Sequence, residues 1–273
     1  MGAKALLVGI NKYAYINPLG GCVNDVKDMA NTLISLGVIH PTPGELRILT
    51  DGNATRANIL AGLKWLVTGA KKGDLRIFHY SGHGSQVVDV NGDEMVDHKD
   101  ETICPQDMQV EKDMITDDHL AALFKGINSS EVTLEVILDS CHSGTGTRDL
   151  NAGDNQTLIR SIRPSLDHSF LIDANPELKN RRVFRNSVID NKMNHVLWAG
   201  CRDSQTSGEG PINGVQRGFF TYAFCKCLRG AGKGIIRAKL DSQISLYMKN
   251  SLHASQTPQL ECDATNMKQP IFT

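Results

Sequence analysis

The sequence has little surplus charge and no long hydrophobic run, and both absences narrow the range of partners. Lys and Arg together number 29 and Asp and Glu 30, so the formal net charge is −1. This balance gives no electrostatic reason to expect nucleic acid or an anionic membrane as the main partner. No stretch reaches the length of a membrane span, and the apolar run in MGAKALLVGINKY is too short for a secretory signal. We therefore expect a cytoplasmic protein.

Paired cysteines and several common enzyme motifs are also missing. The seven cysteines are scattered and form no CxxC pair, which argues against a disulfide framework and against a zinc ribbon. Neither a GxSxG elbow nor a phosphate-binding glycine loop occurs, so serine hydrolases and nucleotide-binding proteins rank low. There is no internal repeat and no low-complexity linker, and a single domain over residues 1–273 is the economical interpretation.

What the sequence does contain is a series of apolar runs suited to buried strands. They start at Lys4, Leu46, Leu75, Thr133 and His195. A last short strand is expected at QLEC, before the C-terminus. Apolar residues at helical spacing lie between and after the longer runs, and they predict helices over residues 26–34, 59–70, 117–124, 219–228 and 240–252. Strands that alternate with helices predict an α/β protein with a mostly parallel sheet. The acidic residues 88–101 and the Arg-rich residues 149–192 fit neither pattern.

Two polar clusters follow two of the predicted strands. LRIFHY runs into Ser81-Gly82-His83-Gly84, and TLEVILD runs into Ser140-Cys141-His142-Ser143-Gly144. Sites in parallel sheets form at the carboxyl ends of the strands, so His83 and Cys141 can face each other if these strands are neighbours. An imidazole can take the proton of a thiol whose ordinary pKa is about 8.5. The backbone N–H groups of Gly84 and Cys141 could then bind the oxyanion of a tetrahedral intermediate.

The same residues allow two other interpretations. Cys141 could be a buried thiol at a strand end and His83 a satisfied loop histidine, since buried cysteines and glycine-flanked turns are common. A zinc site could use His79, His83, Cys141 and His142, although their spacing matches no common zinc module.

The motifs themselves carry a resemblance. HYSGHGSQ around His83 and LDSCHSGT around Cys141 resemble the two signature motifs of metacaspases, the caspase-like cysteine peptidases. Further blocks of the chain look like metacaspase blocks in the family's order: GCVNDVKDM, DETICPQD, AGCRDSQTSGE, GFFTYAF and QTPQLECD. The resemblance implies a caspase-like fold, with a six-stranded sheet whose last strand is antiparallel, flanked by helices. It also implies a monomeric cysteine endopeptidase acting through a Cys-His dyad, with protein or peptide substrates.

The resemblance further implies cleavage after Arg or Lys. The positions that decide this in metacaspases correspond to Cys22, Asp25, Ser81 and Asp139, and two carboxylates suit one guanidinium or ammonium group. The residues alone favour a different interpretation, in which Asp25 is a first-turn carboxylate stabilised by the helix dipole and Asp139 is an aspartate that caps a loop at a strand end.

The acidic segment raises the question of calcium. DVNGDEMVDHKDE partly imitates an EF-hand loop, but Glu94 stands where the turn requires glycine, and a solvated acidic loop is the alternative. Many metacaspases are activated by calcium, and the residues nearest to their ligands are Asp97, Asp100, Glu101 and Asp149. The resemblance thus predicts Ca²⁺ as an activating ion and no organic cofactor.

The Arg-rich segment is a candidate for self-cleavage. An enzyme that cuts after basic residues could cut itself in a segment that carries Arg160, Arg163, Lys179, Arg181, Arg182 and Arg185. A solvated basic loop explains these residues equally well. The rival to a peptidase is a catalytically silent module of the same fold that acts as an adaptor or scaffold.

Overall fold

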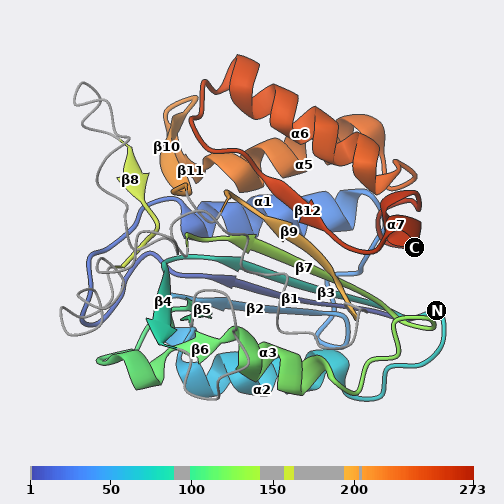
Figure 1. The fold of residues 1–273 in the computed structure, drawn as a ribbon, viewed down its shortest axis with the longest axis horizontal. Coiled ribbons are helices and arrows are strands. Elements are labelled where there is room, and N and C mark those ends of the chain that lie inside the picture. The colour runs from blue at the N-terminus through green and yellow to red at the C-terminus, as the bar shows by residue number, and fades with distance from the viewer. Residues whose placement is uncertain (1, 89–98, 142–156, 163–193, 203–204) are drawn as a thin grey trace.

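A six-stranded sheet forms the centre of the computed structural model, which describes residues 2–88, 99–141, 157–162, 194–202 and 205–273 (Figure 1). The strand order is β12-β9-β7-β3-β1-β2, and every neighbouring pair is parallel except β12 with β9. The strands are β1 (Ala3–Gly9), β2 (Leu46–Thr50), β3 (Leu75–Ser81), β7 (Thr133–Asp139), β9 (Val196–Ala199) and β12 (Gln259–Glu261). The predicted sheet, with QLEC contributing its antiparallel sixth strand, is confirmed.

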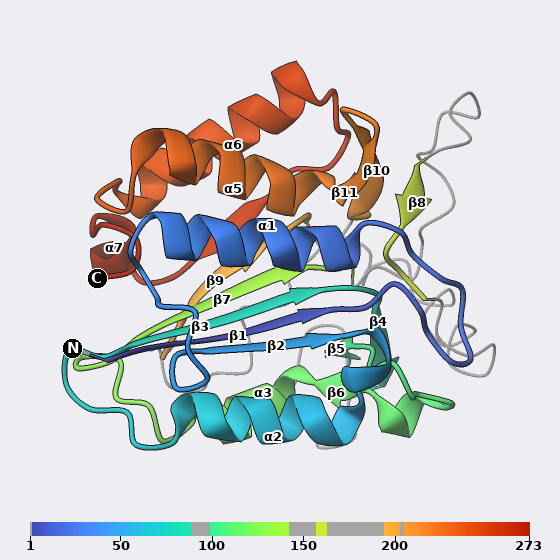
Figure 2. The same ribbon diagram turned by 180° about the vertical axis from the view of Figure 1, so that it is seen from behind.

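Helices cover both faces of this sheet. One face carries α1 (Cys22–Ser35), α5 (Phe219–Ala231) and α6 (Arg237–Ser251), and the other carries α2 (Arg56–Val67) and α3 (Asp117–Phe124), as Figures 1 and 2 show. Each face has its own hydrophobic core, and the two cores are separated by the buried strands. Both faces of the parallel strands are therefore covered, as their near-continuous apolar sequences predict. A short helix, α7 (Ala264–Met267), follows β12.

Local sequence signals set the helix ends. The Thr55 hydroxyl accepts the Asn58 N–H at the start of α2, and the Thr116 hydroxyl accepts the His119 N–H at the start of α3. Gly37, just after α1, adopts a positive φ of 61°, a conformation that glycine reaches without strain. No helix in the described part of the chain has the length and apolar character needed to cross a membrane.

Two small sheets lie at the carboxyl-terminal ends of the parallel strands. One contains β4 (Gly84–Val88), β5 (Lys99–Ile103) and β6 (Ile115–Thr116), and the other contains β8 (Leu158–Ile159), β10 (Gly208–Ile212) and β11 (Val215–Gly218). Figure 1 shows β4, β8 and β10 together beyond the arrowheads of the central sheet. The apolar pattern did not predict these strands; β5 overlaps the end of the acidic stretch 88–101, and β8 lies within the Arg-rich stretch 149–192. Together the small sheets form the surroundings of the candidate site.

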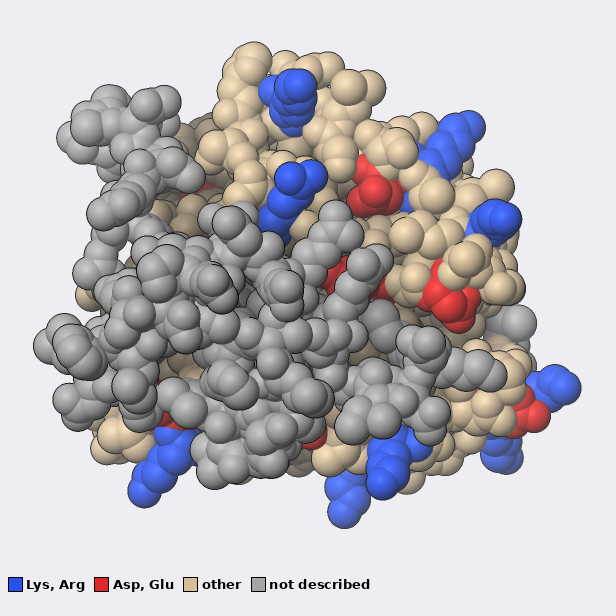
Figure 3. All heavy atoms as spheres, in the orientation of Figure 1, with Lys and Arg blue, Asp and Glu red and all other residues tan. Residues whose placement is uncertain are grey.

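The exposed charges of the described residues are mixed in sign. In Figure 3, Lys and Arg side chains lie around the rim of the visible face with Asp and Glu side chains between them. This distribution agrees with the net charge of −1 over the whole sequence. A separate cluster of charged side chains is buried near the carboxyl-terminal ends of β3 and β7.

Candidate active site

The two sequence-predicted catalytic residues follow the ends of neighbouring strands, β3 and β7, at the same edge of the sheet. The strands pair in parallel and in register from Leu75 with Thr133 to Ser81 with Asp139. His83 and Cys141 each lie two residues beyond this last pair, and both are buried. The neighbouring-strand arrangement that the dyad requires is therefore present.

His83 is held in one tautomer. Its Nε2 donates a hydrogen bond to the Asn17 carbonyl oxygen at 2.9 Å, because a carbonyl can only accept. Its Nδ1 is buried and has no hydrogen-bond partner among the described residues. Burial lowers the pKa of His83 to about 4, and the hydrogen bond to Asn17 opposes this shift. At neutral pH the ring is therefore uncharged and carries its lone pair on Nδ1, as a general base requires.

The Cys141 sulfur lies among groups of the loop before β10. Its Sγ is 3.2 Å from the Gln205 carbonyl oxygen and accepts the Ser207 N–H at 2.7 Å, a contact that suits a thiolate. The Cys201 sulfur is 3.6 Å away. Cys201 is a poor alternative nucleophile, because its hydrogen bond to Cys141 and its burial raise its pKa well above the usual thiol value.

Two backbone N–H groups meet at one carbonyl oxygen. Gly84 and Cys141 donate to the Arg160 carbonyl oxygen at 3.0 and 3.2 Å. These are the two donors that the sequence suggested for an oxyanion, and the distances suit such a site. A Cβ on Gly84 would collide with the Cys141 carbonyl oxygen, so only glycine allows this approach.

The side chain of Arg160 is fully buried among acidic groups. Its Nη2 lies 2.7 Å from Asp25 and 2.9 Å from Glu209, and its Nη1 lies 3.0 Å from Asp139. Nε also donates to Glu209, at 3.2 Å, and Nη1 donates to the Ser81 hydroxyl at 2.8 Å and to the Asp139 carbonyl at 3.2 Å. The five N–H groups of the guanidinium thus all have acceptors. The structure thus places a basic side chain, that of Arg160, among three of the residues predicted to bind one: Asp25, Ser81 and Asp139.

Each carboxylate of this pocket is fixed by other donors. The Asp139 carboxylate accepts the hydroxyls of Ser207 at 2.8 Å and Thr221 at 2.7 Å. Glu209 accepts the backbone N–H groups of Gly20 and Gly21, and the Cys22 sulfur lies 3.7 Å from its Oε2. The pocket is therefore preorganised by the loop before α1 and by the segment that leads into α5.

Burial raises the pKa of Asp25 to about 6, with the nearby charge of Asp139 adding to the rise and the Arg160 guanidinium opposing it. Asp25 accepts the Ser81 hydroxyl at 2.8 Å and the Gly218 N–H at 2.9 Å. A Cβ on Gly218 would lie within 2.7 Å of the Asp25 carboxylate and of the Arg160 guanidinium, so this glycine forms the wall of the pocket.

The predicted calcium ligands are only partly described. Asp100 and Glu101 lie on β5 and are 6% and 2% exposed. Asp97 and Asp149 lie outside the described residues, as does His142 of the alternative zinc site. Within the described ranges, no three His, Cys, Asp or Glu side chains gather in a way that could hold a metal ion. His79, the remaining residue of that zinc set, instead lies 3.3 Å from the Thr221 hydroxyl.

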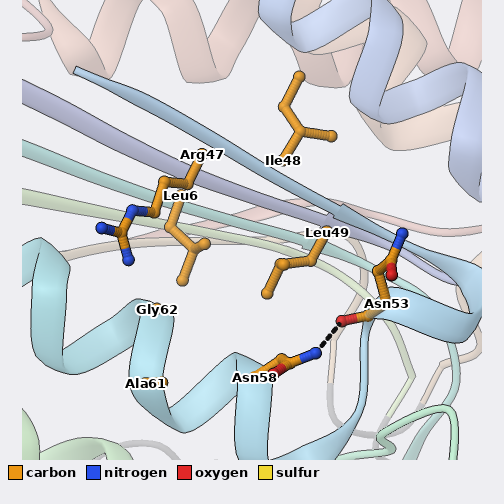
Figure 4. A pocket seen from close by; sticks show the side chains of 8 residues that line it. All are labelled: Leu6, Arg47, Ile48, Leu49, Asn53, Asn58, Ala61 and Gly62. Atoms are coloured by element: carbon orange, nitrogen blue, oxygen red, sulfur yellow. Dashed lines mark hydrogen bonds between the residues drawn. The ribbon is translucent and has the colours of Figure 1, made fainter. Parts of the chain in front are cut away.

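A cavity of about 320 Å³ lies elsewhere, between β2 and α2 (Figure 4). It is lined by Leu6, Arg47, Ile48, Leu49, Asn53, Asn58, Ala61 and Gly62, and Asn58 donates to the Asn53 carbonyl at 3.0 Å. None of these residues belongs to the dyad or to the acidic pocket. The acidic pocket itself is filled by Arg160 of the same chain.

The sequence patterns did not indicate that Glu209 and Arg160 belong to the buried acidic pocket. Glu209 stands in the block AGCRDSQTSGE, but its partners Gly20 and Gly21 are almost two hundred residues away, so no local pattern marks it. Arg160 was one of six basic residues in the same segment, and nothing in their spacing distinguishes it. The other five lie outside the described residues.

A thiol and an imidazole at the ends of adjacent parallel strands, with two N–H donors between them, define a cysteine peptidase of caspase-like fold. Comparison with known proteins agrees. Residues 3–150 match the family described as metacaspase, peptidase C14 domain. The chain is 31% identical to Metacaspase-1 of Schizosaccharomyces pombe over 295 residues, covering 95% of this chain and 67% of that protein. The chain belongs to the metacaspase family.

Other relatives and a solved structure support the same assignment. Metacaspase-1 of Eremothecium gossypii is 29% identical over 95% of this chain, which spans 63% of that protein's length. The crystal structure of a protein from Geobacter sulfurreducens superposes with a TM-score of 0.69 at 26% identity, covering 100% of this chain and 99% of that one. The likeness in fold therefore extends over the whole chain.

Proposed function

We propose that this protein is a cysteine endopeptidase that cleaves after arginine, and that one bond it cleaves is its own, between Arg160 and Ser161. The position of Arg160 carries the proposal. Its carbonyl oxygen accepts the N–H groups of Gly84 and Cys141, while its guanidinium lies among three carboxylates. A substrate arginine needs the same two sets of contacts.

The reaction follows from these positions. His83 Nδ1 takes the proton of the Cys141 thiol, and the sulfur attacks the carbonyl carbon of the arginine residue. The N–H groups of Gly84 and Cys141 stabilise the negative charge that develops on the carbonyl oxygen. His83 then protonates the leaving amine, and water hydrolyses the thioester to release the new carboxyl terminus.

The backbone contacts before Arg160 also match those of a bound peptide. The Arg160 N–H donates to the Ser207 carbonyl at 3.1 Å, and β8 pairs antiparallel with β10, with Ile159 opposite Gly208 and Leu158 opposite Glu209. Adding a strand to an existing sheet is a common way to bind peptides without regard to their side chains. The sequence before the cut is therefore held by its backbone, and the arginine side chain supplies the specificity.

The pocket favours arginine over lysine. All five guanidinium N–H groups find acceptors here, whereas an ammonium group has three donors and lacks the planar shape that the surrounding oxygens match. Aspartate in the same place would meet three carboxylates.

Paired reporter peptides test the specificity. Peptides that end in Arg, Lys or Asp before a fluorogenic amide should be hydrolysed in that order, with Arg ahead of Lys by roughly ten-fold or more in kcat/KM. Cys141→Ala should abolish turnover, and Glu209→Gln should reduce the preference for Arg. Equal turnover of the Arg and Asp reporters would contradict the proposal, and no turnover at all would favour the adaptor alternative.

Self-cleavage has its own test. The purified protein should yield two fragments that stay associated, the second beginning at Ser161, at a rate independent of protein concentration. Cys141→Ala and Arg160→Gln should prevent this cut, and Arg163→Gln, which removes another basic residue of the segment, should not. Fragmentation at Ser161 that persists in Cys141→Ala would implicate a contaminating protease.

Calcium activation is the remaining part of the proposal. Asp100 and Glu101 are nearly buried carboxylates on one strand, a donor type that suits calcium, and Asp97 and Asp149 would complete the set. Bound calcium would relieve the repulsion between these charges. β5 pairs with β4 from Lys99 with Val88 to Ile103 with Gly84. Calcium that orders β5 would therefore also order β4, the strand that begins with Gly84.

Two readouts test this part. Millimolar calcium should raise turnover of the Arg reporter and should raise the unfolding temperature of the Cys141→Ala protein, and Asp100→Asn should weaken both effects. Identical turnover and identical unfolding temperature in calcium and in chelator would overturn the proposal that calcium activates the enzyme.

A further inference from the structure

The chain remains held in the site after the Arg160–Ser161 bond. The Ile162 N–H donates to the Gly84 carbonyl at 2.9 Å, and the buried Ser85 hydroxyl donates to the Ile162 carbonyl at 3.1 Å. Gly84 therefore contacts both sides of the bond, through its N–H to Arg160 and through its carbonyl to Ile162. These contacts fix the direction in which the Ile162 side chain leaves the backbone.

That side chain packs against a small apolar cluster separate from the two main cores. The cluster consists of Cys104, Met108 and Met114, which are at most 4% exposed, and Tyr13, Ile16 and Val87 also pack against it. Methionine side chains are flexible and uncharged, so they adapt to branched apolar groups of different shapes. A charged group placed here would lose its hydration without gaining a partner of opposite charge from the cluster.

We propose that these residues form a subsite for substrates, which selects an apolar side chain two residues after the cleaved arginine. This inference rests on the proposed function and deepens it, because it adds a second side chain to the recognition sequence. Peptides with the pattern Arg-Xaa-Ile, or with another branched or long apolar residue in the third place, are the preferred substrates. The Ser85 hydroxyl positions the backbone at this point.

Internally quenched peptides test the subsite. Three peptides share the sequence Thr-Leu-Ile-Arg-Ser and continue with Ile, Ala or Asp. The wild-type enzyme should cleave the Ile peptide with a kcat/KM roughly ten-fold above that of the Ala peptide, the gain expected from burying most of an isoleucine side chain. The Asp peptide should be cleaved most slowly.

A matched pair of variants tests whether the preference for the Ile peptide arises from the Met108 cluster. Met108→Ala should reduce the ratio of Ile to Ala turnover, and Val110→Ala should leave the ratio unchanged, because Val110 is 49% exposed and lies outside the cluster. The ratio is measured within each variant, so a general loss of activity cancels.

An arginine amide reporter, which has nothing after the cut, separates the two proposals. If the enzyme hydrolyses this reporter but cleaves all three peptides equally, the subsite is overturned and the arginine specificity stands. If it does not hydrolyse this reporter or any peptide, the proposed function itself is overturned.

Discussion

In the proposed function, Asp25 makes the binding of a substrate arginine depend on pH. Burial and the charge of Asp139 raise the pKa of this carboxyl to about 6 with the Arg160 guanidinium in place. When the pocket holds no guanidinium, the main opposing influence is gone and the pKa is higher still. The empty pocket therefore keeps the Asp25 proton to a higher pH than the filled one, and a substrate arginine has to displace this proton.

This protonation of Asp25 determines the direction in which the affinity for arginine changes with pH. Because arginine binds the ionised carboxylate, its affinity falls by at most about ten-fold per pH unit as pH drops from the pKa of the empty pocket towards about 6, the pKa with the guanidinium bound, and levels off below that value. We therefore expect KM for an Arg reporter to rise as pH is lowered from about 8 to about 6. Asp25→Asn should raise KM at pH 7 and flatten its dependence on pH over this range. A KM that stays constant from about pH 8 to about pH 6 in the wild type would contradict the role of Asp25.

At the scale of secondary-structure elements, a second buried ion pair ties α6 to the central sheet. Arg237, the first residue of α6, donates from Nε and Nη2 to Glu135 of β7 at 2.9 and 2.6 Å, and neither side chain is exposed. The Trp198 Nε1 of β9 donates to the other oxygen of Glu135 at 2.7 Å. One carboxylate thus joins two strands and a helix.

Replacing one partner of this ion pair should lower the free energy of unfolding more than replacing both partners. Arg237→Met leaves a buried carboxylate without its cation and should cost about 3–5 kcal/mol of unfolding free energy. Glu135→Leu combined with Arg237→Met should recover part of the loss, although the Trp198 N–H then lacks its acceptor. Urea unfolding in the Cys141→Ala background, which excludes self-cleavage, measures both. A double variant no more stable than the single one would show that the charge pair is not the cause.

The elements also show which features a sequence reveals. Five of the six central strands were predictable because their residues form continuous apolar runs rich in β-branched side chains, whereas β12, with the sequence QLE, has no such run and was expected only as a short last strand. The strands of the small sheets are short and contain sequences such as GEGPI and KDETI, whose strand formation depends on partners distant in the chain. The dyad residues stand next to predictable strands, whereas Glu209 and Arg160 reach the pocket through long-range pairing. Local pattern therefore indicates where the site lies, and tertiary structure decides which charges fill it.

At the scale of the whole molecule, the uncut chain occupies its own site. The pocket combines residues from the whole length of the sequence: Asp25 and Ser81 from the first third, Asp139 and Arg160 from the middle third, and Glu209 from the last third. The pocket can therefore form only when these distant parts of the chain have folded against one another. Because Arg160 is covalently attached, it competes with any added peptide at an effective concentration of the order of millimolar. The proposed cleavage after Arg160 would relieve this competition by turning the segment into a product that can leave.

Binding in trans should reveal this competition. A labelled Thr-Leu-Ile-Arg-Ser-Ile peptide should bind Cys141→Ala roughly ten-fold or more weakly than it binds Cys141→Ala combined with Arg160→Ala, as measured by fluorescence anisotropy. Cys141→Ala combined with Arg163→Ala should behave like Cys141→Ala alone, because Arg160 is retained, and circular dichroism should confirm that all three proteins are folded. Equal affinity with and without Arg160 would mean that the guanidinium in the pocket does not hold the site closed.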